Sequence, residues 1–326
     1  MFDATPRRPP FDPELVPVLD AMRANMPPFT LDTLSDVRRQ MLESPPGMEA
    51  PDLTAAGAVH VEERTVPGPE GAPDITLLVL RPAVGEGPWP AIYHTHGGGM
   101  VLGDRRTGVE MFLPYIVEIG AVVVSVEYRL APEHPDPAPV EDSYAGLAWT
   151  AKHAEDLSVD PSRIMIAGWS AGGGLAAGTA LLARDSAFPD LTHQVLMSPM
   201  LDDRFETVSS RMLDGEGTWD RNDNLLGWSA LLGDRHGGPE VSPYAAPARA
   251  EKLSELPRTY IDVGSVESFR DEAIIYAQRL SEAGVSVDFH LWGGAFHGFE
   301  GIAPHAAVSQ ACNGARDEFI RRALTT

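Results

Sequence analysis

The sequence contains a single cysteine, Cys312, among 326 residues. An intramolecular disulfide is therefore impossible and a reducing compartment is compatible with the chain. We expect Cys312 to fill a small space in a helix. The N-terminus lacks an apolar stretch of signal-peptide length, and no run of about 18 apolar residues occurs anywhere. These absences predict a cytoplasmic protein without a membrane partner.

Basic residues are also scarce, because 25 lysines and arginines stand against 47 aspartates and glutamates, for a formal net charge of −22. Nucleic acids and anionic membrane surfaces repel such a chain, so the charge argues against both as partners and favours neutral or cationic ligands. A length of 326 residues with 43% hydrophobic content is enough for one large catalytic domain with a small appendage.

Short apolar runs alternate with helical patterns along most of the chain. Residues 59–66 and 75–80 are typical of an antiparallel hairpin, because a turn rich in Pro and Gly separates them. The alternation that follows favours a mostly parallel sheet of about eight strands, covered by helices on both faces, which is an α/β fold. The further strands are predicted at residues 91–94, 121–126, 163–167, 193–197, 259–263 and 285–291, and helices at 109–119, 140–153, 173–183, 271–283 and 304–323.

Two segments interrupt this alternation. Residues 1–55 are rich in proline and acidic residues, with helical patterns near 13–26 and 31–42. Residues 201–256 carry Trp219 and Trp228 but no clear strand, and an insertion after a central strand lies over the ligand-binding face of such a sheet. The predicted division is an N-terminal helical cap segment at 1–55, a catalytic domain at 56–200 and 257–326, and a cap or lid insertion at 201–256.

The run Gly168-Trp169-Ser170-Ala171-Gly172 lies between a predicted strand and a predicted helix. A turn this sharp forces backbone against backbone, and the small residues around the serine leave room for it. The G-x-S-x-G pattern alone is weak evidence. In its strand, turn and helix context it predicts that Ser170 is a nucleophile.

Three successive glycines in His96-Gly97-Gly98-Gly99 also follow a predicted strand. Their N–H groups can point at the oxyanion that forms when a serine attacks an ester carbonyl, and each such donor contributes about 3 kcal/mol to the transition state. We expect an oxyanion hole made by Gly98, Gly99 and Ala171. A merely flexible loop is the alternative. His96 is expected to hold this loop by a hydrogen bond, and His94 to be a core or edge residue with a hydrogen-bond partner.

A serine nucleophile needs a base, and the base needs an acid that orients it. His297 follows the last predicted strand and can reach over the carboxyl edge of the sheet, whereas His290 lies inside a strand and His305 opens a helix. His297 is therefore the predicted base.

The acid is expected just after the strand at 259–263, where Asp262, Glu267 and Asp271 are candidates. Asp262 lies within the strand and is expected to face packing or a backbone partner. Asp271 begins a helix, where an aspartate ordinarily caps. Glu267 lies in the loop between them and is the predicted acid.

These motifs resemble those of the bacterial hormone-sensitive-lipase-like carboxylesterases, which have the α/β-hydrolase fold. In that family the acid precedes the Arg-Asp-Glu run by three residues and is usually aspartate, where this chain has Glu267; Asp or Thr usually precedes the nucleophile, where this chain has Trp169. The resemblance covers nearly the whole chain from about residue 55. It rests on His96-Gly97-Gly98-Gly99, Tyr128-Arg129-Leu130-Ala131-Pro132-Glu133, Ser170-Ala171-Gly172-Gly173, Arg270-Asp271-Glu272 and His297-Gly298-Phe299.

The resemblance implies a helical cap joined by the insertion after Met200, hydrolysis of short acyl esters, no cofactor or metal, and compatibility with a homodimer, since many members are dimers. The predicted function is that of a serine carboxylesterase acting on a small-molecule ester through an acyl-enzyme. The alternatives are an amidase, lactonase or acyltransferase with the same triad, or a small-molecule receptor, which the intact triad disfavours. Trp169 is expected to narrow the pocket or to alter its alcohol side.

Overall fold

The computed structural model of the chain describes residues 6–25, 29–42 and 50–325. Its eight strands form one sheet in the order β1-β2-β4-β3-β5-β6-β7-β8. β2 is antiparallel to β1 and to β4, and all other neighbours are parallel. The predicted α/β fold with about eight mostly parallel strands is confirmed. The strands are β1 (Val59–Val66), β2 (Ile75–Pro82), β3 (Trp89–Thr95), β4 (Val122–Glu127), β5 (Val159–Trp169), β6 (His193–Met197), β7 (Arg258–Gly264) and β8 (Val287–Trp292).

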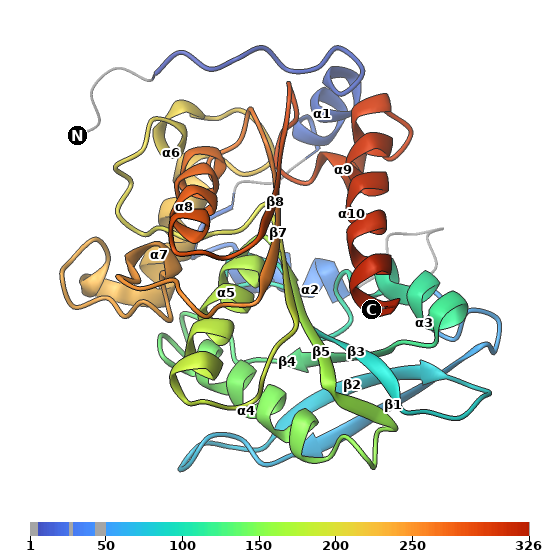
Figure 1. Cartoon of the computed structure of the whole chain (residues 1–326). Helices are drawn as coiled ribbons and strands as arrows, with labels where there is room; N and C mark the ends of the chain where they lie inside the picture. Colours follow the sequence, from blue (N-terminus) through green and yellow to red (C-terminus); the bar gives the residue numbers. More distant parts are fainter. Residues whose placement is uncertain (1–5, 26–28, 43–49, 326) are drawn as a thin grey trace.

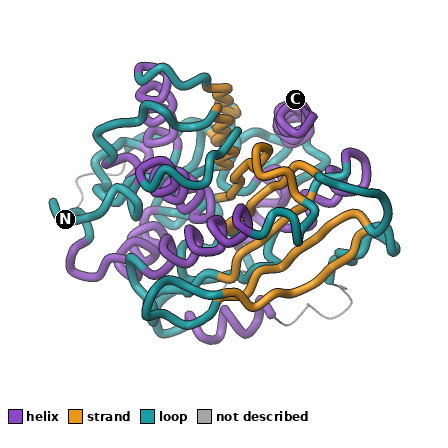
Figure 2. The backbone as a smooth tube through the Cα atoms, turned by 60° about the horizontal axis from the view of Figure 1, so that its bottom comes forward, coloured by secondary structure: helices purple, strands orange, loops and turns teal. Residues whose placement is uncertain are grey.

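Helices cover both faces of this sheet (Figure 1). Figure 2 shows its strong twist, because some strands are seen along their length and others nearly end-on. One face of the sheet carries α3 (Leu113–Ile119), which follows the 3₁₀ turn η1 (Val109–Phe112), and α10 (Ala307–Thr325). The other face carries α4 (Ala138–Lys152), α5 (Ala171–Asp185) and α8 (Arg270–Glu282).

The apolar core lies on both faces of the sheet, which explains why the inner strands are continuously apolar. Successive side chains of a strand point to opposite faces. In β5, Ile164 and Ile166 pack with residues of α4, α5 and α8, whereas Met165 and Ala167 pack with residues of α3 and α10. Cys312 is buried in α10, as predicted.

The regular secondary structure in the described residues of the two segments outside the alternation is helical. The N-terminal segment forms α1 (Val16–Arg23) and α2 (Leu34–Leu42), whereas Met26, the end of the first predicted helix, lies outside the described residues. The insertion at 201–256 has no strand and forms α6 (Ser209–Met212), α7 (Arg221–Leu232) and the 3₁₀ turns η2 (Gly233–Arg235) and η3 (Pro247–Arg249). The two segments touch, because Arg8 pairs with Glu216 and Arg23 donates to the carbonyl oxygens of Gly215 and Gly217.

The α7 helix, which the sequence patterns did not predict, begins with a reciprocal cap. The carboxylate of Asp220 accepts from the N–H groups of Asn222 and Asp223 at 2.7 and 3.1 Å, and Asp223 Oδ2 accepts from the N–H of Asp220 at 3.0 Å. Burial, together with the neighbouring Asp220 charge, raises the pKa of Asp223 to about 6.

Replacing Asp223 by Asn is expected to stabilise the protein at pH 8. In the unfolded chain this carboxyl has a pKa of about 3.9, so the folded wild type loses stability as the pH rises through the window from about 4 to about 6. The amide oxygen of Asn can still accept from the Asp220 N–H. Urea unfolding should show a variant more stable by roughly 1–3 kcal/mol at pH 8 and by less at pH 4. The exposed control Asp234→Asn should not reproduce this difference.

Candidate active site

Ser170 lies at the turn between β5 and α5 with φ 61° and ψ −124°. Few non-glycine residues adopt such a positive φ, so the surrounding packing must hold the turn. Gly168 and Gly172, two residues before and after Ser170, lie too close to other backbone atoms to carry a side chain. A Cβ on Gly168 would lie 2.1 Å from the carbonyl oxygen of Gly172, and one on Gly172 would lie 2.1 Å from that of Thr95. The close approach fixes the serine beside the end of β3.

The structure brings the three predicted catalytic residues together. Ser170 Oγ lies 2.8 Å from His297 Nε2, and His297 Nδ1 lies 3.3 Å from Glu267 Oε1. Ser170 and His297 are only 3% and 5% exposed, and Glu267 is fully buried. The arrangement joins hydroxyl, imidazole and carboxylate in the order that proton transfer from the serine requires.

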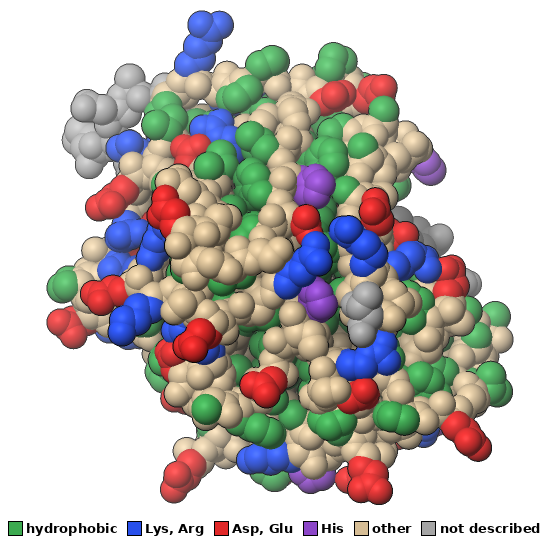
Figure 3. All heavy atoms as spheres, viewed as in Figure 1, with side chains coloured by type: hydrophobic (Ala, Val, Ile, Leu, Met, Phe, Trp, Pro, Cys, Tyr) green, Lys and Arg blue, Asp and Glu red, His purple; other side chains and the backbone are tan. Residues whose placement is uncertain are grey.

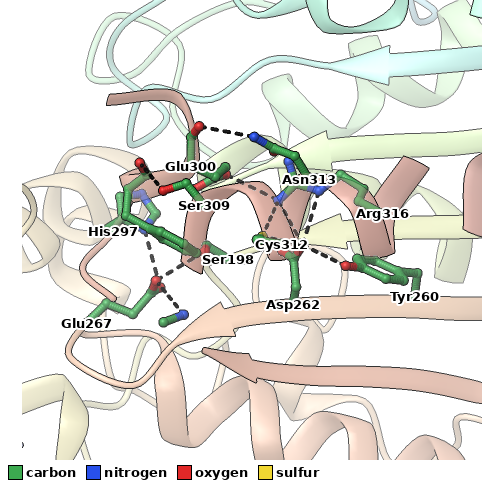
Figure 4. Close-up of polar contacts among 12 residues, drawn as sticks. Ser198, Tyr260, Asp262, Glu267, His297, Glu300, Ser309, Cys312, Asn313 and Arg316 are labelled. Atoms are coloured by element: carbon green, nitrogen blue, oxygen red, sulfur yellow. Dashed lines mark hydrogen bonds and ion pairs between the residues drawn. The ribbon is translucent and has the colours of Figure 1, made fainter. Parts of the chain in front are cut away.

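Two donors hold the other oxygen of Glu267. Ser198 Oγ donates to Oε2 at 3.1 Å and the N–H of Gly264 donates to it at 3.0 Å (Figure 4). Ser198 directly follows β6, at the same edge of the sheet as Ser170. The sequence reasoning missed it. The available signal was a polar residue at the carboxyl end of a parallel strand.

The two other acid candidates have different partners from those expected. Asp262 accepts from Arg316 Nη2 at 2.8 Å and from the hydroxyl of Tyr260 at 3.0 Å (Figure 4), so it forms a buried ion pair and does not face a backbone partner. Asp271 does not cap its own helix. It accepts from the N–H of Ser209 at 2.8 Å, and so attaches α6 to α8.

The glycine loop lies beside Ser170 because β3 pairs with β5, which places Thr95 opposite Gly168. Gly98 and Gly99 have φ values of 123° and 62°, which favour glycine. Ala171 is the first residue of α5, directly after the serine. The three predicted oxyanion-hole residues therefore lie on two adjacent segments.

The histidines before this loop have the structural roles predicted for them. His96 Nδ1 donates to the carbonyl oxygen of Gly97 at 2.8 Å, and its ring stacks on Tyr128. His94 Nδ1 lies 2.9 Å from Ser125 Oγ. Burial, and to a lesser extent the nearby His96, lowers the pKa of His94 to about 3, so the His94 ring is neutral at physiological pH.

The indole of Trp169 packs on the imidazole of His297. It stacks on His297 with ring centroids 4.9 Å apart and planes at 18°. A Cβ on Gly97 would lie 2.6 Å from the indole, and one on Gly298 would lie 3.0 Å from it. The ring therefore reaches from the glycine loop to the histidine loop.

The insertion between β6 and β7 contacts both loops. A Cβ on Gly99 would lie 2.3 Å from the ring of Trp219, which also packs on Phe29 at 5.9 Å between centroids. The hydroxyl of Thr218 donates to the carbonyl oxygen of His297, and Ser268 Oγ donates to that of Trp219 at 3.2 Å. These contacts fix the histidine loop relative to the glycine loop.

Residues 92–301 match the family described as having the alpha/beta hydrolase fold. Over 99% of both chains, the sequence is 34% identical to the carboxylesterase NlhH of Mycobacterium tuberculosis. The chain belongs to this alpha/beta hydrolase family. It is also 35% identical to the esterase LipI of the same organism, over 91% of this chain and 90% of the relative.

Solved structures agree with this membership. A bacterial heroin esterase is similar with a TM-score of 0.86 and 38% identity, over 97% of this chain and 98% of that one. The esterase LipW of Mycobacterium marinum has a TM-score of 0.83 and 32% identity, over 98% and 99% of the two chains. The predicted family and the predicted carboxylesterase function are confirmed.

Replacing Ser198 by Ala is expected to lower kcat on the order of tenfold with little change in KM, because Glu267 loses one of its two donors on Oε2. The pH dependence of kcat should also shift, since Ser198 acts through the Glu267–His297 pair. Steady-state kinetics with p-nitrophenyl butyrate measure both effects. Ser281→Ala, which removes a hydroxyl from α8 that bonds only within the helix, should have wild-type kinetics. An unchanged kcat in Ser198→Ala would contradict the role of Ser198.

Proposed function

We propose that the chain hydrolyses carboxylic esters with Ser170 as nucleophile, His297 as general base and Glu267 as the acid that orients the imidazole. The observation that carries this proposal is the 2.8 Å contact between Ser170 Oγ and His297 Nε2. With its Nδ1 proton held by Glu267, the neutral imidazole presents an unprotonated Nε2 to the hydroxyl. As Oγ bonds to the ester carbonyl carbon, its proton moves to Nε2.

The rest of the reaction uses the same groups. The N–H groups of Gly98, Gly99 and Ala171 stabilise the negative carbonyl oxygen. When the tetrahedral intermediate collapses, the bond between carbon and the alcohol oxygen breaks, and His297 Nε2 protonates that oxygen. Water, deprotonated by His297, then attacks the acyl-enzyme, and the carboxylic acid leaves as Ser170 regains its proton.

We propose that residues 1–55 and 201–256 together form the cap of a catalytic domain made by 56–200 and 257–326. The contacts of Arg8 and Arg23 with the insertion support a shared cap. The preference for short acyl chains follows from Trp219, because its ring lies against Gly99 and limits the space beside the oxyanion loop.

The proposed partner is a small-molecule ester. On the face drawn in Figure 3, basic side chains are interspersed with acidic ones and form no continuous basic surface of the kind that nucleic acids need. No described helix is both long and apolar enough to cross a bilayer. The single cysteine supports a cytoplasmic location, and a homodimer rests on the family resemblance alone.

Ser170→Ala is expected to lower the turnover of p-nitrophenyl butyrate by more than about 10³-fold, because it removes the hydroxyl that lies 2.8 Å from His297 Nε2. The thermal unfolding midpoint of Ser170→Ala should stay within a few degrees of wild type.

Glu267→Gln should lose about 10⁴-fold in kcat, since an amide cannot stabilise the imidazolium. Retained turnover in Ser170→Ala would refute the nucleophile. A panel of matched esters, amides and lactones separates the esterase from the other enzymes that such a triad can serve.

Trp219→Ala is expected to shift the preferred acyl chain of p-nitrophenyl esters to greater length, because it removes the indole that lies against Gly99. Comparing kcat/KM for acyl chains from acetyl to decanoyl measures the shift. Trp149→Ala removes an indole that stacks on His153 at the end of α4, and it should leave the preference unchanged. The same chain-length profile in Trp219→Ala and wild type would mean that another residue limits the acyl chain.

A further inference from the structure

A cavity of about 510 Å³ lies beside the proposed catalytic residues, between α3 and α10. Three of its lining residues are sequence neighbours of those catalytic residues. Gly97 precedes Gly98 of the oxyanion hole, Trp169 precedes Ser170, and Gly298 follows His297. The cavity therefore borders the backbone segments that carry the proposed catalytic residues, and Trp219 does not line it.

The charged residues that line this cavity are mostly acidic. They are Glu110, Glu300 and Asp317, with Arg316 as the basic residue among them. Arg316 is buried and already shared between two carboxylates, because it donates to Asp262 at 2.8 Å and to Glu300 Oε1 at 3.2 Å (Figure 4). The single positive charge of Arg316 is therefore shared by two buried carboxyl groups, Asp262 and Glu300. A further positive charge in the cavity would be stabilised by this cluster.

Two buried polar atoms of the lining residues have no hydrogen-bond partner among the described residues: Glu300 Oε2 and Trp169 Nε1. Glu300 is 7% exposed, and burial raises the pKa of its carboxyl group. A carboxylate oxygen that has lost its water without gaining a donor is costly. A cationic ligand in the cavity would offset that cost, and the Trp169 ring offers an aromatic surface for the same charge.

We propose that this cavity binds the alcohol half of the ester and selects alcohols that carry an ammonium group. The inference rests on the proposed hydrolysis at Ser170. His297 Nε2 must protonate the leaving oxygen, so the alcohol lies beside the imidazole, and Trp169 and Gly298, which flank that imidazole, are cavity walls. Trp219 lies against Gly99 and does not line this cavity, so we assign its ring to the acyl side.

The test compares two acetates of the same shape, those of choline and of 3,3-dimethylbutanol, which differ only in the positive charge. In a pH-stat assay, kcat/KM for the choline ester should exceed that for the neutral ester by about tenfold. The preference should persist in 0.5 M NaCl, because salt screens distant charges more than buried ones. Equal rates for the two esters would overturn the proposal. Loss of p-nitrophenyl acetate turnover in Ser170→Ala tests the proposed hydrolysis separately.

Glu300→Gln should reduce the preference for the cationic ester at least about threefold, since it removes the buried charge at the cavity. Because Glu300 belongs to the cluster around Arg316, Glu110→Gln at the exposed rim provides a second variant, with a smaller reduction in the same direction. The matched control Glu155→Gln removes an exposed charge near the start of β5, far from the strand ends that carry Ser170. A preference unchanged in both cavity variants, or reduced equally in Glu155→Gln, would mean that the overall negative charge attracts the cation and that the cavity does not.

Discussion

The close backbone contact between the turn at Ser170 and the end of β3 is the constraint on which the rest of the site depends. Gly168 and Gly172 permit it, because a side chain at either position would collide with backbone oxygen atoms. The same contact places the glycine loop next to the first residue of α5, so that Gly98, Gly99 and Ala171 can act on one oxygen atom. The positive φ of Ser170 is thus held by packing that also brings together the residues of the proposed oxyanion hole.

The histidine half of the site is held by different parts of the chain. Glu267 and Ser198 come from the ends of β7 and β6, whereas Thr218 and Trp219 come from the insertion that separates those strands. The insertion does more than cover the site, because its residues bond the loop of His297 and pack on the loop of Gly99. Movement of the insertion would therefore change the distance between His297 and Ser170 as well as access to them.

The fold and the positions of the proposed catalytic residues could be predicted because their signals are local. Apolar runs identified all eight strands, and Ser170, His297 and Glu267 each follow a strand that ends at the same edge of the sheet. The α7 helix was missed because its residues are not strongly amphipathic, although Asp220 and Asp223 have the spacing of a reciprocal cap. Ser198, Asp262 and Trp169 each contact a residue that is 54 to 128 positions away in the sequence; Asp262, for example, pairs with Arg316. No local sequence pattern indicates which distant residue such a side chain will meet.

The depth at which Ser170 and His297 are buried bears on what becomes of the acyl group. With 3% and 5% of their surfaces exposed, few water molecules can lie beside the acylated Ser170 of the proposed reaction at any one time. An alcohol bound in the proposed alcohol-binding cavity between α3 and α10 then competes effectively with water for the acyl group. In a medium poor in water and rich in alcohol, the enzyme should synthesise new esters as readily as it breaks them, and the partition between the two outcomes would report how tightly the alcohol is held.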